Sequence, residues 1–281
     1  MPTISVIIPT YNRAHLIKET IKSVLRQTFS DYELIVVDDG STDNTEKLIS
    51  NYPDIRYIKI SNSGQSIASN IGIHASESEY IALLDSDDLW DDHFLSTSYT
   101  VLKENKSYDF SYCNYSYFTS DGLISEKYLP KNKQLSGRFF LEVLKGTFIC
   151  TGSYLIKKEH ITKIGLFDET LTVASDFDIW LRISHEYTGI YIDQSLFKLR
   201  QHSQRISGNS LIMAQFNLKV YNKIRFLFPD EFKNHKSIIM NKKAENHRSI
   251  ARNYRKKNQL GLSVLHYVNA ANYYIRSMYN Y

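Results

Sequence analysis

Short apolar runs alternate with amphipathic helical patterns along the first hundred residues. Continuous β-branched and aliphatic runs bounded by turn residues are typical of buried parallel strands. They predict strands at 3–9, 33–37, 55–60 and 80–84, with helices at 16–25, 43–52, 65–75 and 93–104. Repeated strand–helix alternation indicates an α/β fold with a mostly parallel sheet and right-handed crossovers.

Beyond residue 105 the alternation becomes irregular. Short strands are expected at 109–117, 151–156, 190–192 and 196–199, a polar loop at 118–136, and helices at 139–144, before 164 and at 174–186. From 207 onward the pattern is helical, at 208–228, 236–257 and 261–278. We therefore expect three parts: 1–105, 106–205 and a helical extension at 206–281.

The predicted strand at 80–84 ends in a cluster of carboxylates, Asp85, Asp87 and Asp88. In open α/β sheets, ligands bind beyond the carboxyl ends of the strands. Three carboxylates so close together repel one another unless a cation or hydrogen-bond donors offset their charge. Mg²⁺ is usually held by one or two carboxylates together with substrate phosphates. The cluster therefore predicts a seat for a metal-bound diphosphate; an isolated pair would indicate only a solvated turn.

Composition limits the possible classes. The 281 residues are 42% hydrophobic and 23% charged, as in ordinary soluble globular proteins. The two cysteines, Cys113 and Cys150, lack metal-ligand spacing and indicate thiols in a reducing cytoplasm. With no charged-then-apolar leader and no long apolar run, we expect a cytoplasmic protein whose membrane role, if any, is peripheral.

Glycine-rich phosphate-binding fingerprints do not follow any predicted strand. Neither the dinucleotide pattern nor the P-loop pattern is present. A nucleotide bound at the strand ends must therefore be held by side chains and a metal.

Several motifs together resemble the family 2 glycosyltransferases. The matching segments are Val6–Arg13, Val36–Thr45, Leu84–Asp88, Gly165–Glu169, Ala174–Arg182 and Leu199–His202. The order and spacing of the set carry the resemblance, which covers about 1–205. It implies an inverting enzyme of GT-A fold: a mostly parallel mixed sheet flanked by helices, using a nucleotide-diphospho-sugar and a divalent metal, Mg²⁺ or Mn²⁺.

The resemblance also implies roles for individual residues. Thr10 and Tyr11 would line the base pocket, Asp39 would accept a hydrogen bond from the base edge, and Asp85 would face the ribose. Asp87 would bind the metal, and His202 would join it or be merely packed or hydrogen-bonded. Asp38 and Asp88 are expected in turn and helix-cap roles, Trp90 in the core, and either Arg200 or Arg205 at the diphosphate.

Asp176 matches the catalytic base of the family. An inverting transfer needs a base that takes the acceptor proton. Helical spacing gives Asp178 a surface partner in Arg182, whereas it places Asp176 near Trp180, where desolvation raises the pKa of a carboxylate. Asp176 is therefore the expected base, and Asp178 is the alternative.

Two departures from the family pattern affect the details. Ala68–Asn70 lacks an arginine that often contacts the nucleotide, which puts the identity of the base in doubt, and Ser175 replaces one carboxylate before the helix. We expect transfer of a UDP-linked sugar to an acceptor hydroxyl in bacterial-type surface glycan synthesis. A nucleotide-sugar-binding protein without turnover is the alternative; a small metal-binding signalling module would not explain Asp85, Asp87 or Asp176.

The C-terminal segment differs from the rest in charge. Residues 206–281 carry 13 Lys or Arg and 3 carboxylates, a net +10, whereas the whole chain is only +4. Basic helices with aromatic and aliphatic faces bind anionic membrane surfaces. We expect a saccharide or lipid-linked saccharide acceptor and an anionic membrane surface, the alternative being that the apolar residues pack against the catalytic part. No nucleic-acid module accompanies the charge. The sequence does not indicate the oligomeric state.

Overall fold

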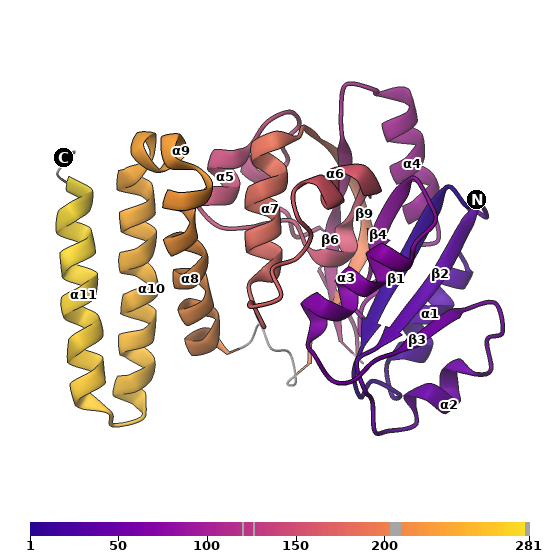
Figure 1. Ribbon diagram of the computed structural model, residues 1–281, viewed down its shortest axis with the longest axis horizontal. Helices are drawn as coiled ribbons and strands as arrows, with labels where there is room; N and C mark the ends of the chain where they lie inside the picture. The colour runs from indigo at the N-terminus through magenta and orange to yellow at the C-terminus, as the bar shows by residue number, and fades with distance from the viewer. Residues whose placement is uncertain (120, 126, 203–208, 279–281) are drawn as a thin grey trace. The chain divides into compact units, whose positions relative to one another are not determined.

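The computed structural model describes residues 1–119, 121–125, 127–202 and 209–278, and the chain forms two compact units. One unit comprises 1–140, 148–172 and 179–202 and contains every strand of the described residues; we call it the sheet unit. The other, the helical unit, comprises 141–147, 173–178 and the C-terminal helices (Figure 1).

The first half of the sheet is parallel, as the alternation predicted. Its order is β3-β2-β1-β4. The bounds are β1 Ile4–Thr10, β2 Tyr32–Asp38, β3 Arg56–Lys59 and β4 Tyr80–Leu83. β3 lies at the edge, in agreement with its alternating polarity, and β4 is internal, between β1 and β8. The apolar residues of β1, β2 and β4 are buried because helices cover both faces of this half (Figure 1).

The second half of the sheet is mixed. β8 is antiparallel to β4 and β6, β9 is parallel to β6, and β5 is antiparallel to β9. The bounds are β5 Leu89–Trp90, β6 Phe110–Thr119, β7 Gly122–Ser125, β8 Tyr154–Lys157 and β9 Gly189–Arg200. The two short strands expected at 190–192 and 196–199 are one strand, which is a correction. The expected loop at 118–136 also contains β7, which pairs with β6.

Helices of the sheet unit occur where the periodicity placed them. They are α1 Ile17–Leu25, α2 Thr45–Ile49, α3 Gln65–Ala75, α4 Phe94–Glu104 and α6 Lys158–Lys163. Two further helices, α5 Phe140–Leu144 and α7 Ser175–Glu186, have residues in both units. Short 3₁₀ turns span Lys131–Lys133 and Thr151–Ser153.

Close packing fixes α3 and the loop of residues 85–88, which we call the acidic loop, on the sheet. A Cβ on Gly72 of α3 would lie 2.4 Å from Cγ2 of Ile7, so only glycine allows this approach. Trp90 is 1% exposed, donates its indole N–H to the Gly152 carbonyl at 2.6 Å and stacks on Phe94. Its expected core role is confirmed.

The helical unit contains the three predicted C-terminal helices and one short addition. The bounds are α8 Ser210–Leu227, α9 Pro229–Asn234, α10 Lys236–Lys256 and α11 Leu260–Met278. α11 packs along α10, and the residues it buries are Ser263, Ala270 and Ser277, which are small and seven apart. None of the helices in the described ranges has the length and apolarity needed to cross a membrane.

Candidate active site

The carboxyl ends of β1, β2 and β4 meet at one edge of the sheet. In the parallel register Thr10 lies beside Asp38, and the Leu84 N–H donates to the Ile7 carbonyl at 3.0 Å. The loops that follow these strands therefore share one edge. Thr10–Tyr11, Asp38–Asp39 and Asp85–Asp87, which follow these strands in sequence, are therefore brought to the same edge.

The loop after β1 is held by Asn12, which has φ +51°. Asparagine tolerates this left-handed conformation better than most residues. Its side-chain oxygen accepts the Thr42 N–H at 2.8 Å, and its own N–H donates to the Ser41 hydroxyl at 2.8 Å. The loop thus presents Tyr11, 45% exposed, while Thr10 is buried and its hydroxyl has no hydrogen-bond partner within the described residues.

Asp39 holds the loop that enters α3. Its two oxygens accept the main-chain N–H groups of Ser63 and Gly64, at 2.6 and 2.9 Å. Gly64 has φ +102°, a conformation that strongly favours glycine. Each carboxylate oxygen keeps a second lone pair, so Asp39 can still accept a base N–H. Neighbouring Asp38 accepts the Ser41 main-chain N–H at 2.8 Å, which is the expected turn role, and also accepts the Tyr57 hydroxyl at 2.6 Å.

Asp87 and His202 are brought together by the fold. His202 Nε2 lies 2.9 Å from Asp87 Oδ2, and Arg13 Nε is 3.9 Å from the same oxygen. The side chains of Asp87 and His202 are each 19% exposed, so solvent reaches the pair. Asp85 lies in the same acidic loop and accepts a hydrogen bond from the Gln65 amide at 2.7 Å.

Arg200 connects the acidic loop to β9. Its main-chain N–H donates to Asp88 Oδ1 at 2.7 Å, and its Nε donates to the Asp87 carbonyl at 2.7 Å. Its Nη2 pairs with Glu19 at 2.6 Å, and its guanidinium stacks on Phe118. Asp88 therefore holds the end of β9, and the expected helix-cap role was wrong. The reason is long-range: the two-residue strand β5 aligns this loop with β9.

Arg200 therefore binds groups of the protein: the residue is 7% exposed, and two of its side-chain nitrogens donate to the Asp87 carbonyl and to Glu19. It is placed to position Asp87. The other arginine considered for the diphosphate, Arg205, lies outside the described residues.

Two residues at this edge had no assigned role from sequence. Arg13 provides the cation nearest to Asp87, and Gln65 orients Asp85. In the sequence, only their positions indicate a role at the site. Arg13 follows the end of β1, and Gln65 begins α3 after the loop held by Asp39.

The donors at this edge fit a metal that is shared with a substrate. No group of three or more His, Cys, Asp or Glu in the described ranges is arranged to hold an ion alone. The candidate protein ligands are one carboxylate, Asp87, and one imidazole, His202. This is enough for Mg²⁺, which commonly combines few protein ligands with phosphate oxygens and waters.

The two candidate bases differ sharply in environment. Asp178 is 1% exposed and is ion-paired with Lys223 of α8, so it is not the surface carboxylate expected. Arg182 donates to the carbonyls of Ile164 and Leu166, both at 2.6 Å. Asp176, in the first turn of α7, accepts the N–H of the next residue, and within the described residues no side chain pairs with it. Burial raises the pKa of Asp176.

Comparison with known proteins gives the family. The profile described as Glycosyl transferase family 2 matches residues 5–165. This chain belongs to that family. A putative teichuronic acid biosynthesis glycosyltransferase of Bacillus subtilis is 30% identical over 233 residues, covering 80% of this chain and 90% of its relative. An uncharacterized glycosyltransferase of Rickettsia typhi is 34% identical, with 75% of this chain and 67% of that protein covered.

Solved structures agree on the fold of this glycosyltransferase. S. aureus TarS 1-349 in complex with UDP-GlcNAc matches with a TM-score of 0.68 at 15% identity, covering 96% of this chain and 92% of TarS. A mannosyltransferase from Pyrobaculum calidifontis in complex with GDP-Man and Mn²⁺ matches with a TM-score of 0.60 at 18% identity, covering 99% and 86%. The GT-A-type fold expected from sequence is confirmed, including the C-terminal helices.

Proposed function

We propose that this glycosyltransferase moves a sugar from a UDP-linked donor to an acceptor hydroxyl, with inversion, during synthesis of a surface polysaccharide. The observation that carries this proposal is the Asp87–His202 pair at the carboxyl edge of the sheet, with Arg13 beside it. The relative named for teichuronic acid biosynthesis supports a surface glycan. The fold likeness to TarS with UDP-GlcNAc supports a uridine donor.

Donor recognition is assigned to residues 1–105. Tyr11 offers its exposed ring to the base, Asp39 accepts from the base edge, and Asp85 accepts from the ribose hydroxyls. Thr10, at the end of β1, contributes to the base pocket a buried hydroxyl that has no hydrogen-bond partner in the described residues. Because Asp39 and Asp85 are already oriented by hydrogen bonds, the nucleotide meets preorganised acceptors, which reduces the ordering cost of binding.

Asp87 and His202 are assigned to a divalent metal, Mg²⁺ or Mn²⁺. When bound, the metal offsets the charge that develops on the leaving diphosphate. Arg13 adds a second positive charge near the same carboxylate. Asp87 has a further task, since its hydrogen bond orients the imidazole of His202.

Asp176 is assigned as the general base within the acceptor-binding part, 106–205. The acceptor oxygen forms its bond to the anomeric carbon while its proton passes to the carboxylate and the bond to the diphosphate breaks. The raised pKa of Asp176 makes its carboxylate a stronger proton acceptor than an ordinary aspartate. Asp178 is already neutralised by Lys223, which supports the choice of Asp176.

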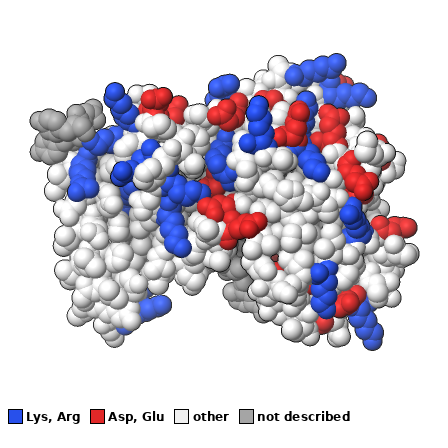
Figure 2. Space-filling view, in the orientation of Figure 1, with Lys and Arg blue, Asp and Glu red and all other residues white. Residues whose placement is uncertain are grey.

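The helical unit is assigned to peripheral attachment at an anionic membrane, where a saccharide or lipid-linked acceptor would lie. The outward side of α11 is apolar and exposed, with Leu262, Val264, Leu265, Val268, Tyr274, Ile275 and Met278 between 43% and 62% exposed. Lys and Arg predominate among the charged residues on the face of this unit in Figure 2. Burying that side in lipid, with cations toward headgroups, accounts for both features.

The donor is tested by thermal shift with UDP and GDP, each with Mg²⁺, with Mn²⁺ or with a chelator. We expect UDP with a metal to raise the melting temperature most, since a ligand stabilises the folded state in proportion to its excess over Kd. A larger shift with GDP would overturn the uridine assignment. Equal shifts with and without metal would overturn the metal assignment.

A further inference from the structure

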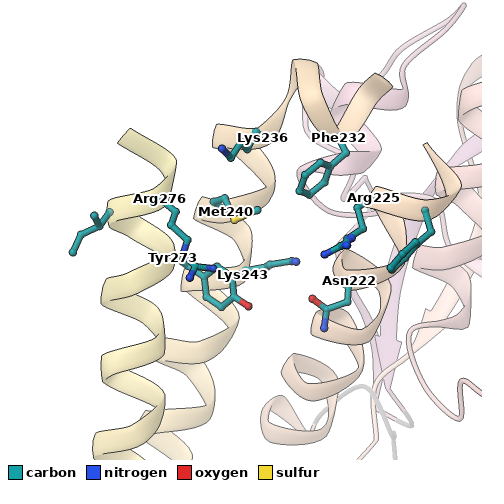
Figure 3. Close-up of a pocket in the computed structure, with 10 residues that line it drawn as sticks. Asn222, Arg225, Phe232, Lys236, Met240, Lys243, Tyr273 and Arg276 are labelled. Carbon is teal, nitrogen blue, oxygen red and sulfur yellow. The ribbon is translucent and has the colours of Figure 1, made fainter. Parts of the chain in front are cut away.

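The helical unit contains a cavity of about 820 Å³ between α8, α9, α10 and α11. Four of its ten lining residues are Lys or Arg, and none is Asp or Glu. Figure 3 shows Arg225 on α8, Lys236 and Lys243 on α10, and Arg276 on α11 around this space. The rest of the lining is mainly apolar, including Met240 and the ring of Tyr273.

Lys243 is the unusual member of this group. It is 5% exposed, and within the described residues no carboxylate pairs with its ammonium. Its ammonium lies over the Tyr273 ring, with 5.6 Å between Nζ and the ring centroid. Burial first, and then the positive charges of Arg225 and Arg276, lower the pKa of Lys243.

No carboxylate in the described part of this unit forms an ion pair with Lys243. Among them, Glu231 pairs with His235 at 3.1 Å, Glu245 pairs with Lys242 at 2.8 Å, and Asp178 pairs with Lys223. A buried ammonium without a partner destabilises a fold, because no opposite charge compensates its desolvation free energy. An anion bound in the cavity would compensate this cost.

We propose that this cavity is a binding site for a phosphate-bearing ligand. Lys243 supplies a point charge at its buried side, while Arg225 and Arg276 supply planar guanidinium groups that match phosphate oxygens in pairs. The ring of Tyr273 and the side chain of Met240 border the organic part of the ligand. The phosphate comes either from a soluble phosphate ester or from a phospholipid headgroup, and both present the same group to the cations.

The test is titration with inorganic phosphate by calorimetry, with UDP and Mg²⁺ saturating so that the nucleotide site is filled. Lys243→Met keeps the length of the side chain and removes its charge. We expect Lys243→Met and Arg225→Gln each to weaken phosphate binding at least about tenfold, the scale of one lost charge-assisted hydrogen bond. The matched control is Lys256→Met, which removes a charge from the exposed end of α10.

Thermal melting separates loss of the ligand from loss of the fold. Without phosphate, Lys243→Met should melt at the same temperature as the wild type or higher, because it removes an uncompensated charge. Phosphate should then raise the melting temperature of the wild type and of Lys256→Met but not of Lys243→Met.

A vesicle arm distinguishes the two sources. If the protein binds vesicles of phosphatidylglycerol but not of phosphatidylcholine, and Lys243→Met abolishes this binding, the site takes a lipid headgroup. If Lys243→Met abolishes binding of inorganic phosphate and the protein does not bind the vesicles, the site takes a soluble ester. If neither probe depends on Lys243, or if Lys256→Met weakens binding equally, the proposal is wrong.

Discussion

Charged groups are handled in opposite ways in the two units. In the sheet unit, Asp39, Asp85 and Asp87 each accept a hydrogen bond from another segment of the chain. In the helical unit, Lys243 is buried among other cations without a carboxylate partner in the described residues. The first arrangement orients acceptors before a ligand arrives, whereas the second leaves a buried ammonium that the proposed phosphate would neutralise.

The units also differ in packing. In the sheet unit helices contact the sheet so closely that Gly72 has no room for a methyl group. In the helical unit α11 covers only one side of α10 and leaves its own outward side in solvent. Substitutions at the close helix–sheet contacts should therefore affect stability, whereas substitutions on the outward side of α11 should mainly affect binding.

The largest expected effect comes from Asp87→Ala. It removes the carboxylate that holds His202 and is assigned to the metal, so transfer should fall to background and metal-dependent UDP binding should disappear, while the fold persists. Calorimetry with UDP and Mn²⁺ and a sugar-transfer assay measure the two losses. The control is Asp92→Ala, which removes an exposed carboxylate paired with Arg26. Metal-dependent UDP binding that survives in Asp87→Ala would exclude Asp87 as the ligand.

Asp176→Asn should lower kcat by about 10² to 10⁴-fold with little change in UDP affinity, because it removes only the proton acceptor. Asp178→Asn is the comparison. It should act mainly on stability, since it leaves the ammonium of Lys223 unpaired. If Asp178→Asn lowers kcat more than Asp176→Asn while both remain folded, the assignment of the base is reversed.

The pH profile provides an independent check of the base. Because burial raises the pKa of Asp176, the acid limb of kcat/KM should lie above the range of an ordinary aspartate and should vanish in Asp176→Asn. The same shift means that the ionised side chain costs folding free energy above its unfolded pKa. Asp176→Asn should therefore be no less stable than the wild type at neutral pH. An acid limb unchanged in the variant would assign it to another group.

A pair of glycines compares packing in the two units. Gly72→Ala should destabilise the protein by about 1–3 kcal/mol, since its Cβ would overlap Ile7. Gly261→Ala, near the start of α11, meets nothing within 4 Å and should stabilise by about 0.5–1 kcal/mol. Urea unfolding of both variants measures the difference. Equal effects would show that the two units are packed alike.

The last expected effect is on membrane binding. Leu265→Glu on the outward side of α11 should weaken binding to anionic vesicles, measured by sedimentation, by about 1.5–3 kcal/mol, the value of burying one leucine. Leu123→Glu replaces a similarly exposed leucine of β7 and should change nothing. If Leu265→Glu does not change vesicle binding, the outward side of α11 does not insert into the membrane.

Local pattern predicted most elements but few of the contacts at the site. Strands β1, β2 and β4, and helices α3, α10 and α11, lie within a residue or two of their predicted positions, because their hydrophobic periodicity is strong. β9 was divided in two because the polar segment 193–195 resembles a turn. In the structure a shift in register near Asn114 of β6 absorbs that segment.

The expectations about individual carboxylates show the same limit of local pattern. Asp88 was expected to cap a helix, and Asp178 to lie at the surface with a partner at i+4. The structure adds partners far along the chain, the main chain of Arg200 for Asp88 and the ammonium of Lys223 for Asp178, at separations of 112 and 45 residues. Periodicity reports neighbours within one helix or strand, and it contains no information on which distant segment will pair with a given side chain.

Contacts at the candidate site join residues that are far apart in the sequence, and this separation affects when the site can form during synthesis. Asp87 and His202 are 115 residues apart, and Arg200 and Glu19 are 181 apart. Contacts of such long separation form late and slow folding, because the intervening loop must close first. A nascent chain that has not yet released His202 from the ribosome lacks one member of the Asp87–His202 pair, even though β1 to β4 are already available. A ligand that requires both side chains therefore cannot assist the earliest folding steps of this protein.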